Sequence, residues 1–243
     1  MRILLLCFIC STLNCAFSQN ETSVKKQYNW FDNIVGIENT NLINGITFHE
    51  RLKTLDEKGQ YLISKLFKIG NITYNGQPYF DIQIKYDVFN DQIILSGLNN
   101  NGYFAIQLVK YLVNSFSLNE RNFINSQQLK VTTNNTNNKG FFEVLHLNPN
   151  ISLYKKHKKD KQVKKNDQIS YLEFRDKQEY MLYLNNEIHP LNSKKNVLKL
   201  FPHLKKQINQ FYAKNRALMA YDYDKFLIKL IQNLNLLSEE VND

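Results

Sequence analysis

Residues 66–96 hold the pattern that most constrains the fold of this chain. Its clearest strand alternates four apolar residues with four polar ones, namely Phe80, Ile82, Ile84 and Tyr86 with Asp81, Gln83, Lys85 and Asp87. A period of two is typical of a strand that buries one face. The preceding Asn75-Gly76 suits a type I′ hairpin turn because both residues tolerate positive φ, and Asn90-Asp91 turns the chain again. The pattern therefore predicts consecutive antiparallel strands joined by tight turns.

The same alternation of short apolar runs and turn residues continues over residues 42–191. The further strands are expected at 103–109, 111–118, 119–129, 141–147, 151–156, 180–184 and 187–191. Short connections favour neighbouring antiparallel strands, and a meander of this length must bury its apolar face. We therefore expect a mainly β (α+β) fold, an antiparallel β meander curled into a barrel or sandwich. Residues 19–41 precede it as a polar N-terminal leader, with Tyr28, Trp30 and Phe31 as candidates to pack against the fold.

After Pro190 the apolar residues recur at steps of three and four instead of two. They are Val197, Leu198, Phe201, Leu204, Ile208, Phe211 and Tyr212, followed by Phe226, Leu227, Leu230, Ile231, Leu234 and Leu237. This spacing is typical of one face of a helix. Pro202 suits a first helical turn, and Asp222 suits a helix cap. Residues 192–238 are therefore expected to form a C-terminal helical hairpin packed on the β domain; a helical hairpin that binds a partner is the alternative.

The first 18 residues are typical of a cleavable secretory signal peptide. Arg2 supplies a positive start, residues 3–13 are apolar, and Ala16 and Ser18 place small residues before a cut at Gln19. The apolar run is much shorter than the roughly 20 residues that span a bilayer. We therefore expect an exported protein, periplasmic, associated with the cell envelope or secreted, with no transmembrane segment in its mature chain.

The sequence lacks the common motifs of catalytic, metal-binding and cofactor-binding sites. All three cysteines lie at or before Cys15, so the mature chain is expected to lack disulfides, thiolate nucleophiles and cysteine-ligated metals. The five histidines form no His-x-x-x-His or His-Glu-x-x-His pattern. There is no Gly-x-Ser-x-Gly elbow and no phosphate or dinucleotide loop. The sequence therefore predicts no catalytic residue, no metal ligand and no cofactor.

Carboxylates and aromatic residues leave two alternatives open. Paired carboxylates could hydrolyse a glycan, and the obvious acidic cluster is Asp81, Asp87 and Asp91, which are expected to be solvated strand-edge and turn residues. The aromatic residues near the first hairpin are Tyr74, Tyr79, Phe80, Tyr86 and Phe89. They are expected to pack across neighbouring strands; a groove for a carbohydrate or lipid is the alternative.

The positive charge of the chain is concentrated in one segment. The formal net charge is +9, or +8 without Arg2, and the segment from Lys155 to Lys165 carries +6 of it. Its lysines are Lys155, Lys156, Lys158, Lys159, Lys161, Lys164 and Lys165, with Asp160 as the only acid. One hypothesis is a docking patch for a polyanion, such as anionic lipid or an acidic glycan. The other is a solvated hairpin tip whose like charges guard a strand edge. Nucleic acid is not expected as a partner, because no aromatic residue is interleaved with these lysines.

Several motifs follow one another in an informative order. They are Tyr74-Asn75-Gly76-Gln77-Pro78-Tyr79, Lys85-Tyr86-Asp87, Gly140-Phe141-Phe142-Glu143-Val144-Leu145, the lysine-rich stretch 153–159 and the stretch 196–208 with Leu200-Phe201-Pro202. In this order they resemble a family of uncharacterised exported proteins of Bacteroidetes-type bacteria. The resemblance covers roughly residues 42–235 and departs at His203 and Phe142, where the family has an acidic residue and tyrosine. It implies an envelope protein of a Gram-negative bacterium and supplies no catalytic residue.

Together these features predict an exported envelope protein that is non-enzymatic and works by binding or assembly. An anionic lipid, a glycan or an envelope protein would contact the lysine-rich segment. The alternative is a hydrolase that acts on an envelope polymer through dispersed carboxylates. Two close carboxylates in a concave pocket would favour this alternative.

Overall fold

The computed structural model describes residues 20–52, 54, 58–99, 102–130, 139–166 and 169–239. The predicted signal peptide lies outside these residues. Among the helices in the described ranges, none is both long enough and apolar enough to cross a membrane.

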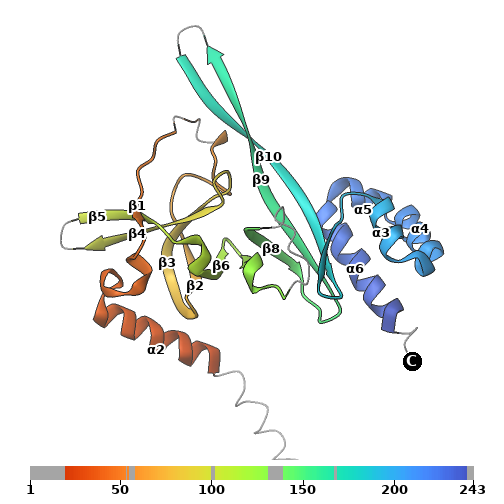
Figure 1. The fold of residues 1–243 in the computed structure, drawn as a ribbon, viewed down its shortest axis with the longest axis horizontal. Helices are drawn as coiled ribbons and strands as arrows, with labels where there is room; N and C mark the ends of the chain where they lie inside the picture. Colours follow the sequence, from red (N-terminus) through yellow and green to blue (C-terminus); the bar gives the residue numbers. More distant parts are fainter. Residues whose placement is uncertain are drawn as a thin grey trace, which may run out of the picture.

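The strands of the described residues form one antiparallel sheet in the order β1-β5-β4-β3-β2-β6-β7-β8-β9-β10-β11 (Figure 1). Their bounds are β1 Ile46–Thr47, β2 Lys68–Tyr74, β3 Gln77–Asp87, β4 Gln92–Asn99, β5 Gly102–Gln107, β6 Val113–Leu118, β7 Arg121–Asn125, β8 Phe141–His146, β9 Ile151–Asn166, β10 Ile169–Leu184 and β11 Glu187–Pro190. The predicted antiparallel meander followed by helices is confirmed. Of the two expected arrangements, a barrel or a sandwich, the barrel is not formed, since the strand order runs from β1 to β11 without closing.

Tight turns with positive φ set the register of the hairpins. Asn75 and Gly76 have φ of 50° and 81° and join β2 to β3, as the sequence predicts for a type I′ turn. Asn185 and Asn186, with φ of 51° and 61°, join β10 to β11 in the same way. Asparagine tolerates this left-handed region better than other residues with a side chain. These short turns keep consecutive strands adjacent, which is why the meander can be read from the sequence.

Among the described residues, two large hydrophobic cores and a small cluster of Phe142, Tyr154 and Met181 lie along this sheet. The first surrounds Tyr86, whose ring contacts Phe116, Phe123 and Phe141 with centroids 5.3–5.8 Å apart. The second joins the base of β9 and β10 to the C-terminal helices through Leu153, among others. Tyr74, Tyr79 and Tyr86 are buried in the first core as expected, whereas Phe80 contacts Tyr28 and the exposed Phe89 contacts Phe174.

The C-terminal region is more finely divided than a helical hairpin. The α-helices are α3 Lys194–Leu200, α4 Lys205–Lys214, α5 Arg216–Tyr221 and α6 Tyr223–Glu239, and a 3-10 turn at Pro202–Leu204 separates α3 from α4. The Asp222 carboxylate accepts a hydrogen bond from the Lys225 backbone N–H at 2.9 Å and so caps α6, as expected. The apolar faces of these helices pack on β9 and β10, because Phe226, Leu227 and Leu230 are fully buried in the second core.

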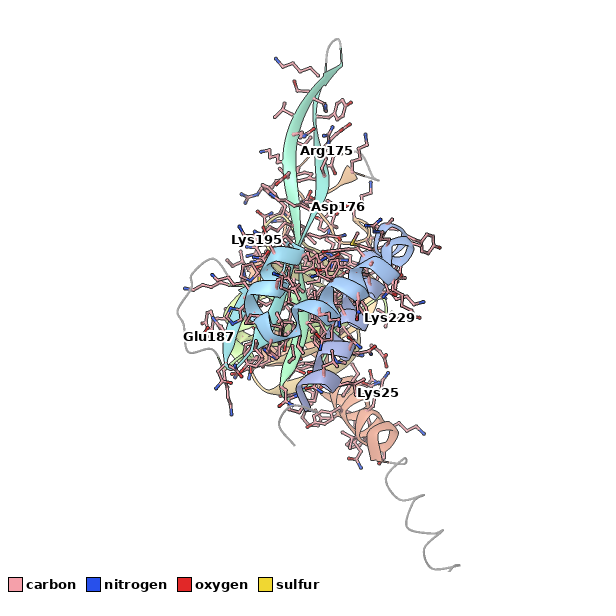
Figure 2. The ribbon with its side chains drawn as sticks, turned by 90° about the vertical axis from the view of Figure 1, so that its right-hand side faces the viewer. Lys25, Arg175, Asp176, Glu187, Lys195 and Lys229 are labelled. Carbon is pink, nitrogen blue, oxygen red and sulfur yellow. The ribbon has the colours of Figure 1, made fainter. Side chains whose placement is uncertain are left out.

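The expected N-terminal leader contains a helix, α2, over Asn20–Val35. Only one of its three aromatic residues packs against the sheet, because Tyr28 contacts Phe80 of β3 whereas Trp30 and Phe31 are exposed. In both views α2 lies at the lower end of the molecule, opposite the long hairpin of β9 and β10 (Figures 1 and 2).

Candidate functional site

The lysine-rich segment forms one strand of a long hairpin arm. β9 and β10 pair continuously from Ile151 opposite Leu184 to Asn166 opposite Ile169. The neighbouring strands pair only with their base, since β8 ends opposite Leu153 to Lys155 and β11 ends opposite Met181 to Leu184. Residues 156–166 and 169–180 therefore leave the body as a two-stranded arm (Figure 1). The strands expected at 151–156 and 180–184 are much longer than predicted, and the lysines lie within a strand and not at a turn.

Four of the seven lysines are held by groups of the protein itself. Lys155 contacts the Asp224 carboxylate of α6 at 2.6 Å, and its side chain is only 6% exposed. Lys158 pairs with Glu179 at 2.7 Å, and Lys159 pairs with Asp176 at 2.9 Å across the arm. These acids lie on β10 or α6, far from the lysines in sequence. The charge of the segment is therefore much smaller in the structure than its composition suggests.

Lys156 is held without an acid partner. Its ammonium donates to the Lys139 backbone carbonyl and lies 5.5 Å from the centre of the Phe142 ring. Burial lowers the pKa of Lys156, because a low-dielectric surrounding disfavours the charged form. This lysine is therefore an anchor at the base of the arm and is poorly placed to meet a ligand.

Lys161, Lys164 and Lys165 remain, and they form the arm end. None of the three has an ion-pair partner among the described residues, and Lys161 and Lys165 are exposed. Nearby acids are engaged elsewhere or face another cation, since Glu173 pairs with Lys58 at 3.0 Å and Asp160 lies opposite Arg175. Figure 2 shows Arg175 and Asp176 along the arm, below this cationic end. The structure thus reduces the predicted seven-lysine patch to a smaller group at the far end of the hairpin.

Between β1 and β2, the described residues of 48–67 (48–52, 54 and 58–67) brace the arm against the body; we call them the strap. Its Lys58 forms the ion pair with the buried Glu173, and Thr54 forms a parallel bridge with Leu172 of β10. The ring of Phe89 also packs on Phe174, with centroids 4.9 Å apart. These contacts hold the arm as far as Leu172, which pairs with Val163, and Arg51 and Leu52 of the strap line a hollow together with Ser170 and Tyr171 of the arm.

The three acids of the predicted cluster point to three different partners. Asp81 binds Lys25 and Asn29 of α2 at 2.8 and 3.0 Å, and its hydrogen bond from Lys25 lowers its pKa. Asp91 accepts from the Tyr86 hydroxyl at 2.7 Å and pairs with Lys110 at 2.6 Å. They therefore do not form one acidic site.

Asp87 is buried, which corrects the expectation that it is a solvated strand-edge residue. It is 1% exposed and accepts hydrogen bonds from the backbone N–H and the side chain of Asn90 at 2.9 and 2.8 Å. Burial raises its pKa, because water no longer stabilises the ionised form. The strap covers this end of β3, so the strand is buried on both faces.

Lys85 lies in a second charged cluster that the sequence analysis missed. Its ammonium lies 4.3–4.9 Å from the ring centres of Phe48, Tyr61 and Phe67 and 3.3 Å from Glu50. Tyr61 donates its hydroxyl proton to Glu50, and burial followed by that contact raises the Tyr61 pKa. All of these partners of Lys85 lie in the strap, so the cluster fastens the strap over β3 through cation–π and ionic contacts. Little in the sequence indicates this cluster, because residues 48–67 have an ordinary aromatic content, with Phe48, Tyr61 and Phe67 as the three aromatic residues.

A network of charged residues separates the two cores. Glu143 lies between Phe141 of the first core and Leu145 of the second along β8. His157 lies 2.5 Å from Glu143, and both side chains are about nine-tenths buried. Lys155 lies opposite Glu143 on β9 and reaches Asp224, which also accepts from the Tyr180 hydroxyl at 2.5 Å. Burial, then the contact with Asp224, raises the pKa of Tyr180, so this hydroxyl stays protonated and donates.

An open hollow of about 380 Å³ lies beside this network, where α5 meets α6. It is lined by Lys155, Gln178, Tyr180, Tyr221, Asp222, Tyr223 and Asp224. Two carboxylates are therefore close together here, but both are already in use, Asp222 as a helix cap and Asp224 in the network. In the described ranges no three histidine or acidic side chains come together as they would around a metal ion.

No family model, curated protein or solved structure matches this chain. The resemblance to exported proteins of Bacteroidetes-type bacteria therefore stays a prediction from the sequence.

Proposed function

We propose that the protein is exported to the cell envelope and is a non-enzymatic binding or assembly protein that docks on a polyanion through the arm end. The observation that carries the proposal is the position of Lys161, Lys164 and Lys165. They lie on a hairpin that leaves the body, and no acid of the described residues pairs with them. Lysines without an internal ion pair can bind an extended anionic polymer directly, because no ion pair within the protein has to break first.

The rigid base of the arm supports the same proposal. The ion pairs of Lys155, Lys158 and Lys159, together with the strap, align the hairpin without using the distal lysines. Preorganisation of this kind lowers the entropy lost on binding. The alternative role for these lysines, protection of the open strand edges, requires charge but no ligand.

The test is retention on immobilised heparin, a soluble acidic glycan that serves as the probe. We expect the variant K161Q/K164Q/K165Q to elute at clearly lower NaCl than the wild type, because each lost lysine removes one ionic contact. The matched control is K195Q/K199Q/K206Q, which removes the same charge from exposed positions of α3 and α4. Equal elution of the two variants would show that net charge alone decides retention and would overturn the proposal.

The alternative, a hydrolase, has the hollow between β10 and α6 as its best location. One observation favours it, the proximity of Asp222 and Asp224 beside the buried Lys155. A D222N variant that keeps its fold and loses hydrolysis of an envelope polymer would support this alternative. We prefer the binding function because Asp222 already caps α6 and Asp224 already pairs with the buried Lys155.

A further inference from the structure

Helix α2 has its polar and apolar faces reversed relative to an ordinary surface helix. Its inward residues Lys25 and Asn29 bind Asp81 at 2.8 and 3.0 Å, and Tyr28 packs on Phe80. A helix on a protein surface normally buries its apolar stripe and exposes its polar one. In α2 the contacts with the sheet are instead mostly polar, and they leave the apolar residues outside.

The outward face carries an apolar stripe. Val24, Trp30, Phe31 and Ile34 are 40%, 66%, 49% and 65% exposed. At about 100° per residue these four positions fall within roughly a third of the helix circumference. They therefore form an apolar stripe along α2 that is interrupted by the exposed Gln27, and Trp30 is the only tryptophan of the chain.

The size of this patch argues against a second copy of the protein as its partner. The exposed parts of the four side chains amount to roughly 450 Å², which is the size of the largest apolar patch on a typical monomer, and such patches are often functional. A stable protein interface needs about 800 Å² from each partner. The stripe supplies about half of that area, and Lys25 and Asn29, which could contribute polar contacts, are bound to Asp81.

We propose that α2 lies in the interface of a lipid bilayer, with Val24, Trp30, Phe31 and Ile34 inserted at the level of the headgroups. Tryptophan, phenylalanine and aliphatic residues on one face of a helix are typical of interfacial helices. The exposed Lys26 and the positive net charge of the chain complement an anionic lipid surface.

The position of α2 in the molecule suits a flat partner. The helix lies at one end of the molecule in both views, with Lys25 turned toward the body, and the arm points the other way (Figures 1 and 2). A bilayer can therefore reach the helix without meeting the arm. This placement extends the arm away from the membrane, so the inference goes beyond the proposed function and does not depend on it.

Trp30 makes the proposal directly measurable, because it is the only tryptophan and fluorescence excited selectively in tryptophan therefore reports on α2 alone. We expect vesicles of phosphatidylcholine and phosphatidylglycerol to move its emission to shorter wavelength. Quenching by acrylamide should fall roughly threefold, as for a ring that leaves water for the headgroup region.

The variant V24Q/F31Q/I34Q keeps the reporter and replaces exposed residues by a good helix former. Its thermal unfolding should match the wild type, and its emission should no longer respond to vesicles. K195Q/K199Q/K206Q, which removes three charges from exposed positions away from α2 and the arm end, is the matched control and should respond as the wild type does. Three results would overturn the proposal: no vesicle response in the wild type, an unchanged response in V24Q/F31Q/I34Q, or emission that shifts with protein concentration in the absence of lipid, which would indicate a second copy on the stripe.

Discussion

The ion pair between Lys155 and Asp224 should respond very unequally to the loss of its two members. The Lys155 side chain is 6% exposed, whereas that of Asp224 is 34% exposed. In D224A the buried ammonium loses its partner at 2.6 Å, and the Tyr180 hydroxyl loses an acceptor at 2.5 Å. Breaking a buried pair in this way costs about 3–5 kcal/mol. Glu143 opposite Lys155 supplies part of the missing charge, so we expect a loss of about 2–3 kcal/mol in the free energy of unfolding.

The reverse change should cost much less. In K155M a methionine of similar length fills the space of the lysine, and Asp224 can be hydrated and still accept from Tyr180. Replacing a buried cation by a well-packed apolar residue is often near neutral, so the loss should be about 1 kcal/mol or less. The double variant K155M/D224A should be more stable than D224A alone, which gives a coupling of about 1–2 kcal/mol.

Urea unfolding followed by circular dichroism measures these differences, with the slope of the transition checked to be unchanged. The midpoint temperature of D224A should fall by about 5–10 °C for a chain of this size. Equal losses in D224A and K155M, or a loss below about 0.5 kcal/mol in D224A, would refute the argument that burial of the ammonium controls this junction.

Two further changes test other parts of the fold. Burial raises the Asp87 pKa, so Asp87 binds a proton more readily in the folded than in the unfolded state. As the pH falls from 7 through this raised pKa toward about 4, the wild type should therefore gain stability relative to D87N. Urea unfolding at several pH values measures this difference, and parallel curves of stability against pH for the two proteins would contradict it. Gly140 has a φ of 119°, and a Cβ there would come within 1.9 Å of the Asp91 carboxylate. G140A should therefore lose about 2–4 kcal/mol of unfolding free energy, whereas G76A, whose Cβ would meet nothing within 4 Å, should lose about 1 kcal/mol. Equal losses in the two variants would contradict the close approach of Gly140 to Asp91.

The first hairpins and the C-terminal helices could be predicted because local sequence specifies them. Asn75-Gly76 has one strongly preferred turn, and the alternation from Phe80 to Tyr86 identifies a strand without knowledge of its neighbours. Likewise the spacing from Phe226 to Leu234 identifies α6 and its buried face. In these cases the local preference and the tertiary packing agree.

The arm and the strap could not be predicted because their stability comes from distant partners. The stretch from Lys155 to Lys165 shows no apolar alternation, and it becomes a strand because β10 places Asp176 and Glu179 beside Lys159 and Lys158. Asp87 looks like a solvated acid until the strap covers it. The same limitation applied to the candidate site, since only the tertiary structure shows which lysines are neutralised.

The central claim, that the three distal lysines bind a polyanion, is tested most directly by the salt dependence of heparin binding. Affinities are measured by titration calorimetry between low and physiological NaCl for the wild type, K161Q/K164Q/K165Q and K195Q/K199Q/K206Q. Each lysine that contacts the polymer releases about one counterion, so the slope of log affinity against log salt should fall by about 2–3 for the arm variant and by much less for the control. Equal slopes for the wild type and the arm variant would contradict the account.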